Sequence, residues 1–127
     1  MSCRCNYPNR LRPDAMEKSG RKAVVTGVNG KRSFTDGERV VDVHFIEGSV
    51  HARGFMMVHL PADKILIEAD AFTPGVPNAP PPATPNALHL NLVQNLERLN
   101  LQVDRILPLH GRIVPVAELY TAVGRKN

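Results

Sequence analysis

Three polar residues stand where strand-like runs begin or end, and their types could bind a metal ion. His51 lies in the stretch GSVHARG, Asp70 follows the apolar run ILI and the residues Glu68 and Ala69, and His110 follows the run ILPL. Two imidazoles and one carboxylate are donors that zinc or a similar divalent ion accepts. Because loops held by a rigid scaffold often carry function, these residues are candidate metal ligands.

The same three residues also have an ordinary structural interpretation. His51 and His110 could be loop histidines without a ligand, and Asp70 could cap the proline-rich turn that follows it. Scattered histidine and aspartate side chains are more often structural than functional. The spacing alone leaves both interpretations open.

Two predicted hairpins would position these side chains. The stretch FTDGERV (34–40) places an Asp-Gly turn between two extended arms, which is a strong hairpin signal. The stretch MMVHLPADKILI (56–67) joins two apolar runs through a Pro-Ala-Asp turn. A further strand is predicted over Lys22–Val28 from its β-branched residues.

The second half of the chain predicts a helix, a strand and a second helix. Six prolines between residues 74 and 85 exclude a helix or central strand there, since each removes a backbone donor. Leucines at helical spacing follow, with Thr84 as the expected N-cap and Pro85 as the first helical residue. A strand is predicted over residues 103–111, and a last amphipathic helix begins at Pro115.

These elements predict an α+β fold with one mainly antiparallel β-sheet and helices on one face. The other face would be apolar and open, as Phe55, Met57 and Ile67 indicate. Large exposed apolar patches usually mark an interface. We therefore expect a homo-oligomer, in the simplest case a dimer, formed through the open sheet face.

Two longer stretches resemble a known family. GSVHARGFMMVHLPADKILIEADAFTP resembles the segment of metallo-β-lactamase-fold hydrolases in which a histidine precedes a strand, Leu-Pro, strand hairpin and then an aspartate. LNLQVDRILPLHG resembles their later segment, where a histidine-glycine pair closes the metal site. The resemblance runs from about Arg21 to Tyr120. It divides the chain into an irregular N-terminal segment, residues 1–20, and a half-domain, residues 21–127.

The resemblance implies a metal site with zinc as the expected ion. His51 would be a ligand of the first metal, Asp70 would bridge two metals, and His110 would be a ligand of the second. In such hydrolases the two ions share a hydroxide that attacks the substrate, because coordination lowers the pKa of water toward neutrality.

One part of the family's pattern is absent. Its principal signature, His-x-His-x-Asp-His, occurs nowhere in the 127 residues. His44 and His59 fall within predicted strands and His89 on the leucine-lined helix, so we interpret them as packing or surface residues. The chain thus resembles only the C-terminal half of a four-layer αββα sandwich. Its zinc ligand set is incomplete, and no catalytic residue is assigned.

Three functional hypotheses follow from this partial resemblance. A truncated half-domain could be a non-catalytic oligomeric or interaction module. Alternatively, two copies could rebuild a metal-dependent hydrolase site as a homodimer. In the third hypothesis, a separate N-terminal half completes the enzyme. The substrate stays open, because fold does not determine function.

The composition and charge of the chain argue against several classes of function. Hydrophobic residues make up 43% and charged residues 22% of the chain, which is typical of soluble globular proteins. There is no apolar run near the roughly 20 residues that span a bilayer and no signal-peptide core, so we expect a cytoplasmic protein without a membrane partner. The net charge of +4 is scattered and aromatic residues are only 5%, which argues against nucleic-acid binding. We interpret Cys3 and Cys5 as free thiols, although a Cys-x-Cys pair could also bind metal or oxidise, so their role stays open.

Overall fold

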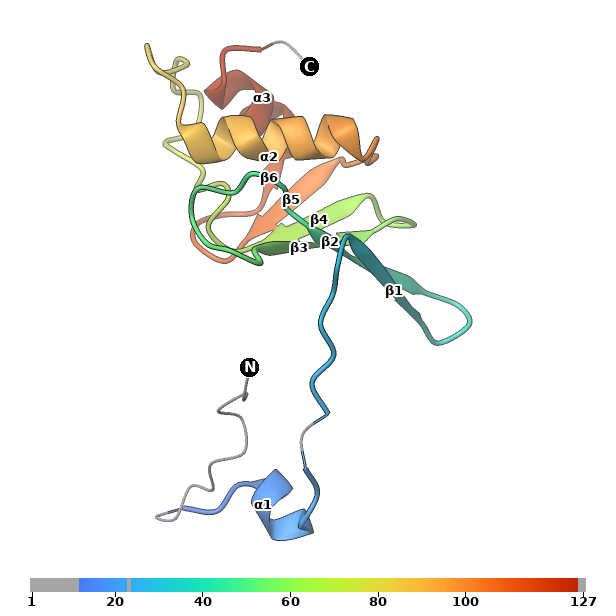
Figure 1. Ribbon diagram of the computed structural model, residues 1–127. Helices are drawn as coiled ribbons and strands as arrows, with labels where there is room; N and C mark the ends of the chain where they lie inside the picture. Colours follow the sequence, from blue (N-terminus) through green and yellow to red (C-terminus); the bar gives the residue numbers. More distant parts are fainter. Residues whose placement is uncertain (1–11, 23, 126–127) are drawn as a thin grey trace.

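The computed structural model describes residues 12–22 and 24–125, and residues 31–122 form one sheet with two helices packed on it (Figure 1). Cys3 and Cys5 lie outside the described residues. The elements are α1 (Ala15–Ser19), β1 (Lys31–Thr35), β2 (Val40–Phe45), β3 (Met56–Leu60), β4 (Ile65–Glu68), α2 (Ala87–Arg98), β5 (Arg105–Pro108), β6 (Val114–Pro115) and α3 (Val116–Ala122). The strands follow the order β1-β2-β3-β4-β5-β6, and of these neighbours only β4 and β5 are parallel. The predicted α+β class, a mainly antiparallel sheet with helices on one face, is confirmed.

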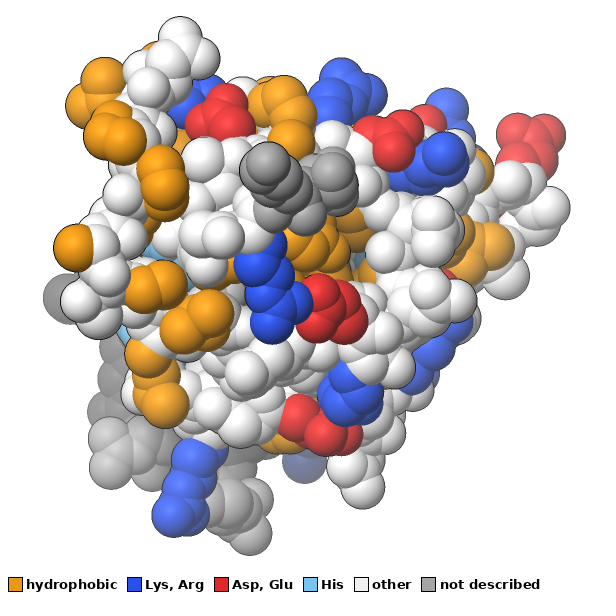
Figure 2. Space-filling model, turned by 90° about the horizontal axis from the view of Figure 1, so that it is seen from above, with side chains coloured by type: hydrophobic (Ala, Val, Ile, Leu, Met, Phe, Trp, Pro, Cys, Tyr) orange, Lys and Arg blue, Asp and Glu red, His pale blue; other side chains and the backbone are white. Residues whose placement is uncertain are grey.

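Side-chain alternation gives the sheet two faces of different character. Along β2 and β3, every second residue is buried, and the buried set continues into Leu66 of β4 and Ile106 of β5, both 0% exposed. These side chains point toward α2 and α3, which lie together on one side of the sheet (Figure 1). We call this side the covered face. Seen from the helix side, the surface carries basic and acidic side chains interspersed with apolar ones (Figure 2).

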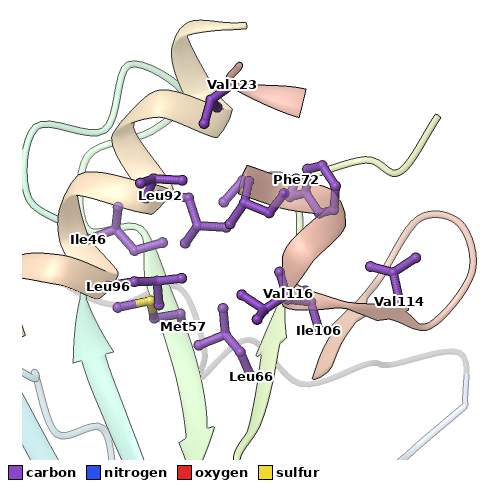
Figure 3. Packing of buried hydrophobic residues seen from close by; sticks show 13 residues of the cluster. Ile46, Met57, Leu66, Phe72, Leu92, Leu96, Ile106, Val114, Val116 and Val123 are labelled. Carbon is purple, nitrogen blue, oxygen red and sulfur yellow. The ribbon is translucent and has the colours of Figure 1, made fainter. Parts of the chain in front are cut away.

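The core lies between the covered face and the two helices. In Figure 3, Leu92 and Leu96 of α2 lie against Met57 of β3 and Ile46, the residue after β2. The full buried apolar set is Ile46, Met57, Leu66, Ala71, Phe72, Leu92, Val93, Leu96, Ile106, Val114, Val116, Leu119 and Val123. Burying a side chain of this size contributes about 1.5–3 kcal/mol. This cluster therefore fixes how the strands and helices sit together.

The helix α2 begins two residues later than expected. The side-chain oxygen of Asn86 accepts a hydrogen bond from the Leu88 backbone N–H at 2.8 Å, and Asn86 is extended, as an N-cap should be. The prediction of Thr84 as N-cap and Pro85 as first helical residue is therefore wrong. Both residues precede the helix, and the asparagine nearest the helical run supplies the cap.

The end of α2 is closed by backbone hydrogen bonds that redirect the chain toward β5. Asn100 adopts a positive φ of 49°. Its N–H donates to the Glu97 carbonyl, and the Leu101 N–H donates to the Leu96 carbonyl, each at 3.0 Å. This pair of bonds is the Schellman arrangement, which satisfies carbonyls at a helix end. The residues after it are thereby held against the sheet.

The segment before β1 differs from its predictions. The described residues of the predicted strand Lys22–Val28 form no strand, and Val24 and Val25 are 93% and 63% exposed. β-branched residues favour strands mainly by packing on a half-buried surface, which this segment does not have. Before it, α1 is a short helix capped by Asp14, with no buried residue. In Figure 1 this segment runs away from the sheet, on the side opposite α2 and α3.

The second face of the sheet is mainly apolar and also carries Arg32 and Arg105, and we call it the open face. Val43, Val58, Ile67 and Leu107 are register partners that form one row across β2, β3, β4 and β5. Among the described residues, no helix packs on this side (Figure 1). Ile67 is 38% exposed, whereas its neighbour on the covered face, Leu66, is fully buried.

Two of the three residues predicted on the open face lie elsewhere. Met57 is 1% exposed and belongs to the core, and Phe55 packs against that core. Only Ile67 lies where it was expected. The alternation of β3 places Met56, Val58 and Leu60 on the open face instead.

Candidate metal centre at the strand ends

Three neighbouring strands bring His51, Asp70 and His110 to the same end of the sheet. His51 precedes β3, Asp70 follows β4, and His110 follows β5. Because β3 is antiparallel and β5 parallel to β4, these three chain positions meet at the same end. The Nε2 atom of His51 lies 3.3 Å from Oδ2 of Asp70, and Nε2 of His110 lies 3.2 Å from Oδ1. The structure thus brings both sequence-predicted histidines into contact with Asp70.

Glu68 shapes the turn that presents Asp70. Its side chain is buried, and Oε2 accepts hydrogen bonds from the backbone N–H groups of Ala71 at 2.7 Å and Phe72 at 3.0 Å. Its own backbone carbonyl accepts from the Leu109 N–H at 2.9 Å, which ties the His110 segment to β4. Burial raises the pKa of Glu68 above its usual value. The sequence analysis did not single out Glu68, although an acid ending an apolar strand was a signal.

Asparagines of α2 hold the loop that carries His51. The Glu47 backbone N–H donates to Oδ1 of Asn95 at 2.9 Å, and its carbonyl accepts from Asn91 and Asn95 Nδ2 at 2.8 and 3.0 Å. The His51 ring packs against Phe55 with the ring centroids 5.1 Å apart. The loop is therefore fixed to the core at one end and by an aromatic contact at the other.

The loop after His110 is held by a glycine and an ion pair. Gly111 has a φ of +110°, and a Cβ there would lie 3.2 Å from Pro74, so another residue would be strained. Arg112 makes two hydrogen bonds to the Glu118 carboxylate of α3, one of them 2.9 Å long. This contact raises the pKa of Arg112 and lowers that of Glu118. The helix thereby anchors the loop that presents His110.

The three candidate ligands are reachable from solvent. Their side chains are 41% (His51), 37% (Asp70) and 60% (His110) exposed. Donor atoms about 2.1 Å from a tetrahedral zinc ion lie about 3.4 Å from one another, close to the observed spacings. Each imidazole contacts its own carboxylate oxygen, so Asp70 stands between the two rings. This arrangement fits a bridging acid, with positions left for further ligands.

A second group of ligand-type residues lies on the covered face. Asp42, His44 and His59 are all buried, and one donor atom of each lies within 4.8 Å of the others. The sequence analysis assigned both histidines to packing or the surface and did not consider Asp42. The missed signal is the polar pair at positions 42 and 44, which shares a strand face with the buried Ile46.

His89 of α2, the third histidine that the sequence analysis assigned to packing or the surface, packs against the loop after β4. Its ring meets Phe72 edge-on, with centroids 4.8 Å apart. Both line a cavity of about 600 Å³ between the proline-rich connection, α2 and α3. In Figure 2, apolar side chains gather along the left edge, over this connection. The cavity lining includes none of the three candidate ligands.

Comparison with known proteins identifies the fold. No protein-family model and no curated protein matches the chain. A metallo-β-lactamase from Pontibacter korlensis is similar at 17% identity with a TM-score of 0.57, over 86% of this chain and 51% of that one. The flavodiiron protein from Giardia intestinalis is similar at 18% identity and a TM-score of 0.56, over 87% and 31%.

An archaeal metallo-β-lactamase superfamily protein from Sulfolobus tokodaii is similar at 23% identity and a TM-score of 0.51, over 72% of this chain and 35% of that one. The chain therefore spans about half, or less, of the length of these structures. Its fold is that of half a metallo-β-lactamase domain. Within the described residues, no helix is long and apolar enough to cross a membrane.

Proposed function

We propose that this chain is a non-catalytic association module whose open sheet face binds a second copy of itself. The supporting observation is the apolar row Val43, Val58, Ile67 and Leu107, which crosses four strands without a polar residue. Contiguous exposed apolar patches are typical of protein interfaces. The covered face, in contrast, already has its helices.

A second copy is the simplest occupant of this face. Two sheets pack face to face about 10 Å apart and bury their inner side chains against one another. In a symmetric dimer the same patch serves both subunits, so one self-complementary apolar surface is sufficient. The matched structures support this proposal, because each is about twice as long as this chain or longer. Two half-domains would supply a comparable amount of chain.

The oligomeric state of the Val58→Asp variant tests the association. Val58 lies at the middle of the row, where a buried carboxylate would be costly to desolvate. We expect the unmodified chain to be a dimer by light scattering and Val58→Asp to be a folded monomer. Ile113→Asp is the matched control, because Ile113 is 61% exposed and lies outside the sheet. A chain that is monomeric at every concentration contradicts the proposal.

A second candidate function is a metal-dependent hydrolase, whose site is completed by the second copy or by a separate N-terminal half. The contacts of Asp70 with His51 and His110 favour it. These three residues would hold zinc, which lowers the pKa of bound water and so supplies a nucleophile near neutral pH. Asp70 would be a ligand alongside both imidazoles, and Glu68 fixes the turn that carries it.

Zinc content of the Asp70→Ala variant tests this second candidate. Elemental analysis after zinc dialysis should show that Asp70→Ala loses metal that the unmodified chain retains. Asp63→Ala is the control, because Asp63 is an exposed acid in the β3–β4 turn. An unchanged zinc content in Asp70→Ala means that the strand-end residues hold no metal. That result would leave the association proposal standing.

A further inference from the structure

The buried group Asp42, His44 and His59 lies apart from the strand-end residues. Asp42 and His59 are register partners on β2 and β3, and His44 follows two residues later on the same face. His59 stands near the end of β3, whereas His51 precedes its start. All three side chains belong to residues no more than 5% exposed. They therefore form a separate cluster inside the covered face, which we call the β2–β3 cluster.

His44 is the member of this cluster that lacks an explanation in terms of packing. Both of its ring nitrogens are buried and have no hydrogen-bond partner among the described residues. A neutral imidazole has one donor and one acceptor nitrogen, and buried polar side chains normally have hydrogen-bond partners. The His44 and His59 rings lie with centroids 6.3 Å apart. A histidine buried in this way is suited to donate a lone pair to a cation.

His59 is oriented as metal-binding histidines usually are. Its Nε2 lies 2.9 Å from the backbone carbonyl of Gln102. A carbonyl accepts, so Nε2 carries a hydrogen, and in the neutral ring the lone pair is then on Nδ1. Metal-bound histidines typically donate their other N–H to a carbonyl or carboxylate. The chain turn at Asn100, which closes α2, places Gln102 for this contact.

Asp42 already forms an ion pair with Lys31. Its Oδ2 lies 2.8 Å from Nζ of Lys31, and its Oδ1 accepts from the Ser33 hydroxyl at 2.6 Å. The Lys31 side chain is 51% exposed, whereas that of Asp42 is 7% exposed. The Lys31 ammonium group can therefore move into solvent while the rest of the chain stays folded. A divalent cation that binds Asp42 would take the place of Lys31.

We propose that Asp42, His44 and His59 form a buried site for zinc or a divalent ion of similar ligand preference, in which the ion competes with Lys31. Two imidazoles and a carboxylate match that class of ion. The ligands come from two strands, so the ion would fasten β2 to β3. The role would be structural, because the group is closed to solvent. This site would not depend on the strand-end residues or on association.

Cobalt binding to the Asp70→Ala chain tests this proposal. The substitution removes the carboxylate that contacts both strand-end histidines, and cobalt bound by nitrogen and oxygen donors gives visible d–d absorption bands. We expect one cobalt per chain, displaced by zinc, and a rise in thermal unfolding temperature on binding. Adding His44→Leu should abolish the bands. His89→Leu is the matched control, since His89 is the other histidine with a buried unpaired nitrogen, and it should leave them unchanged.

Lys31→Gln separates metal binding from general effects on folding. The residue is half exposed, and glutamine can keep a hydrogen bond to Asp42. Removing the competing ammonium should raise cobalt affinity about tenfold, because like charges repel strongly near a buried site. An absence of cobalt bands in Asp70→Ala, or bands that survive in folded Asp70→Ala/His44→Leu, overturns the proposal. So does an affinity that Lys31→Gln leaves unchanged.

Discussion

The covered and open faces of the sheet are built from the same strands and differ in what packs on them. On the covered face, Leu66 and Ile106 are buried by two helices, and polar residues such as His44 and Glu68 are enclosed with them. On the open face, Val58 and its register partners are apolar, and no described helix covers them. The first face is complete within one chain. The second is left without a covering helix by the described residues.

Adjacent residues of β4 test this difference with the largest expected effect. Leu66→Ala should lower the free energy of unfolding by about 2–5 kcal/mol, because it leaves a cavity in a packed core. Ile67→Ala should cost less than about 1 kcal/mol, since Ile67 is 38% exposed on the open face. Urea unfolding in dilute solution, where a dimer dissociates, measures both. Equal losses would mean that the open face is packed within the chain.

Removing the cap of α2 should have the next largest effect. Asn86→Ala should cost about 0.5–2 kcal/mol, because the Leu88 N–H loses its side-chain acceptor. Thr84→Ala is the control and should be within about 0.5 kcal/mol of the unmodified chain, as is usual at surface positions. Urea unfolding measures both variants. If Thr84→Ala cost more than Asn86→Ala, the helix would begin where the sequence predicted it.

The free energy of unfolding should also depend on pH through His89 of α2, and the His89→Leu substitution should remove this dependence. Burial lowers the pKa of His89, so the unfolded chain takes up a proton at a higher pH than the folded chain. This contribution to stability is therefore full above the unfolded pKa of about 6.5 and is lost as pH falls below it. Urea unfolding at several pH values measures it, with His89→Leu against the unmodified chain. An identical slope in both proteins would contradict the prediction.

The sequence pattern was sufficient to predict the elements whose apolar residues alternate or recur at helical spacing. The Asp-Gly turn at residues 36–37 and the apolar alternation of β3 predicted their hairpins, and the leucine spacing predicted α2. The meeting of His51, Asp70 and His110 followed from their places beside strands. These features depend on local spacing, which the sequence carries directly.

Features that depend on distant partners could not be predicted in this way. Val24 and Val25 have strand-forming side chains but no neighbouring strand to pair with. Met57 was placed on the wrong face because its burial depends on where α2 lies. The roles of Glu68 and Asp42 rest on hydrogen bonds that exist only in the fold. Tertiary contacts, rather than residue type, decide all of these positions.

The concentration dependence of methyl NMR signals tests most directly whether the open face is the association surface. The methyl groups of Val58 and Ile67 on the open face should shift between dilute and concentrated solution. Those of Leu66 and Ile106 in the core serve as internal controls and should not move. Shifts confined to the open face are the predicted result. Signals that stay constant at every concentration, or shifts located elsewhere, would contradict the account.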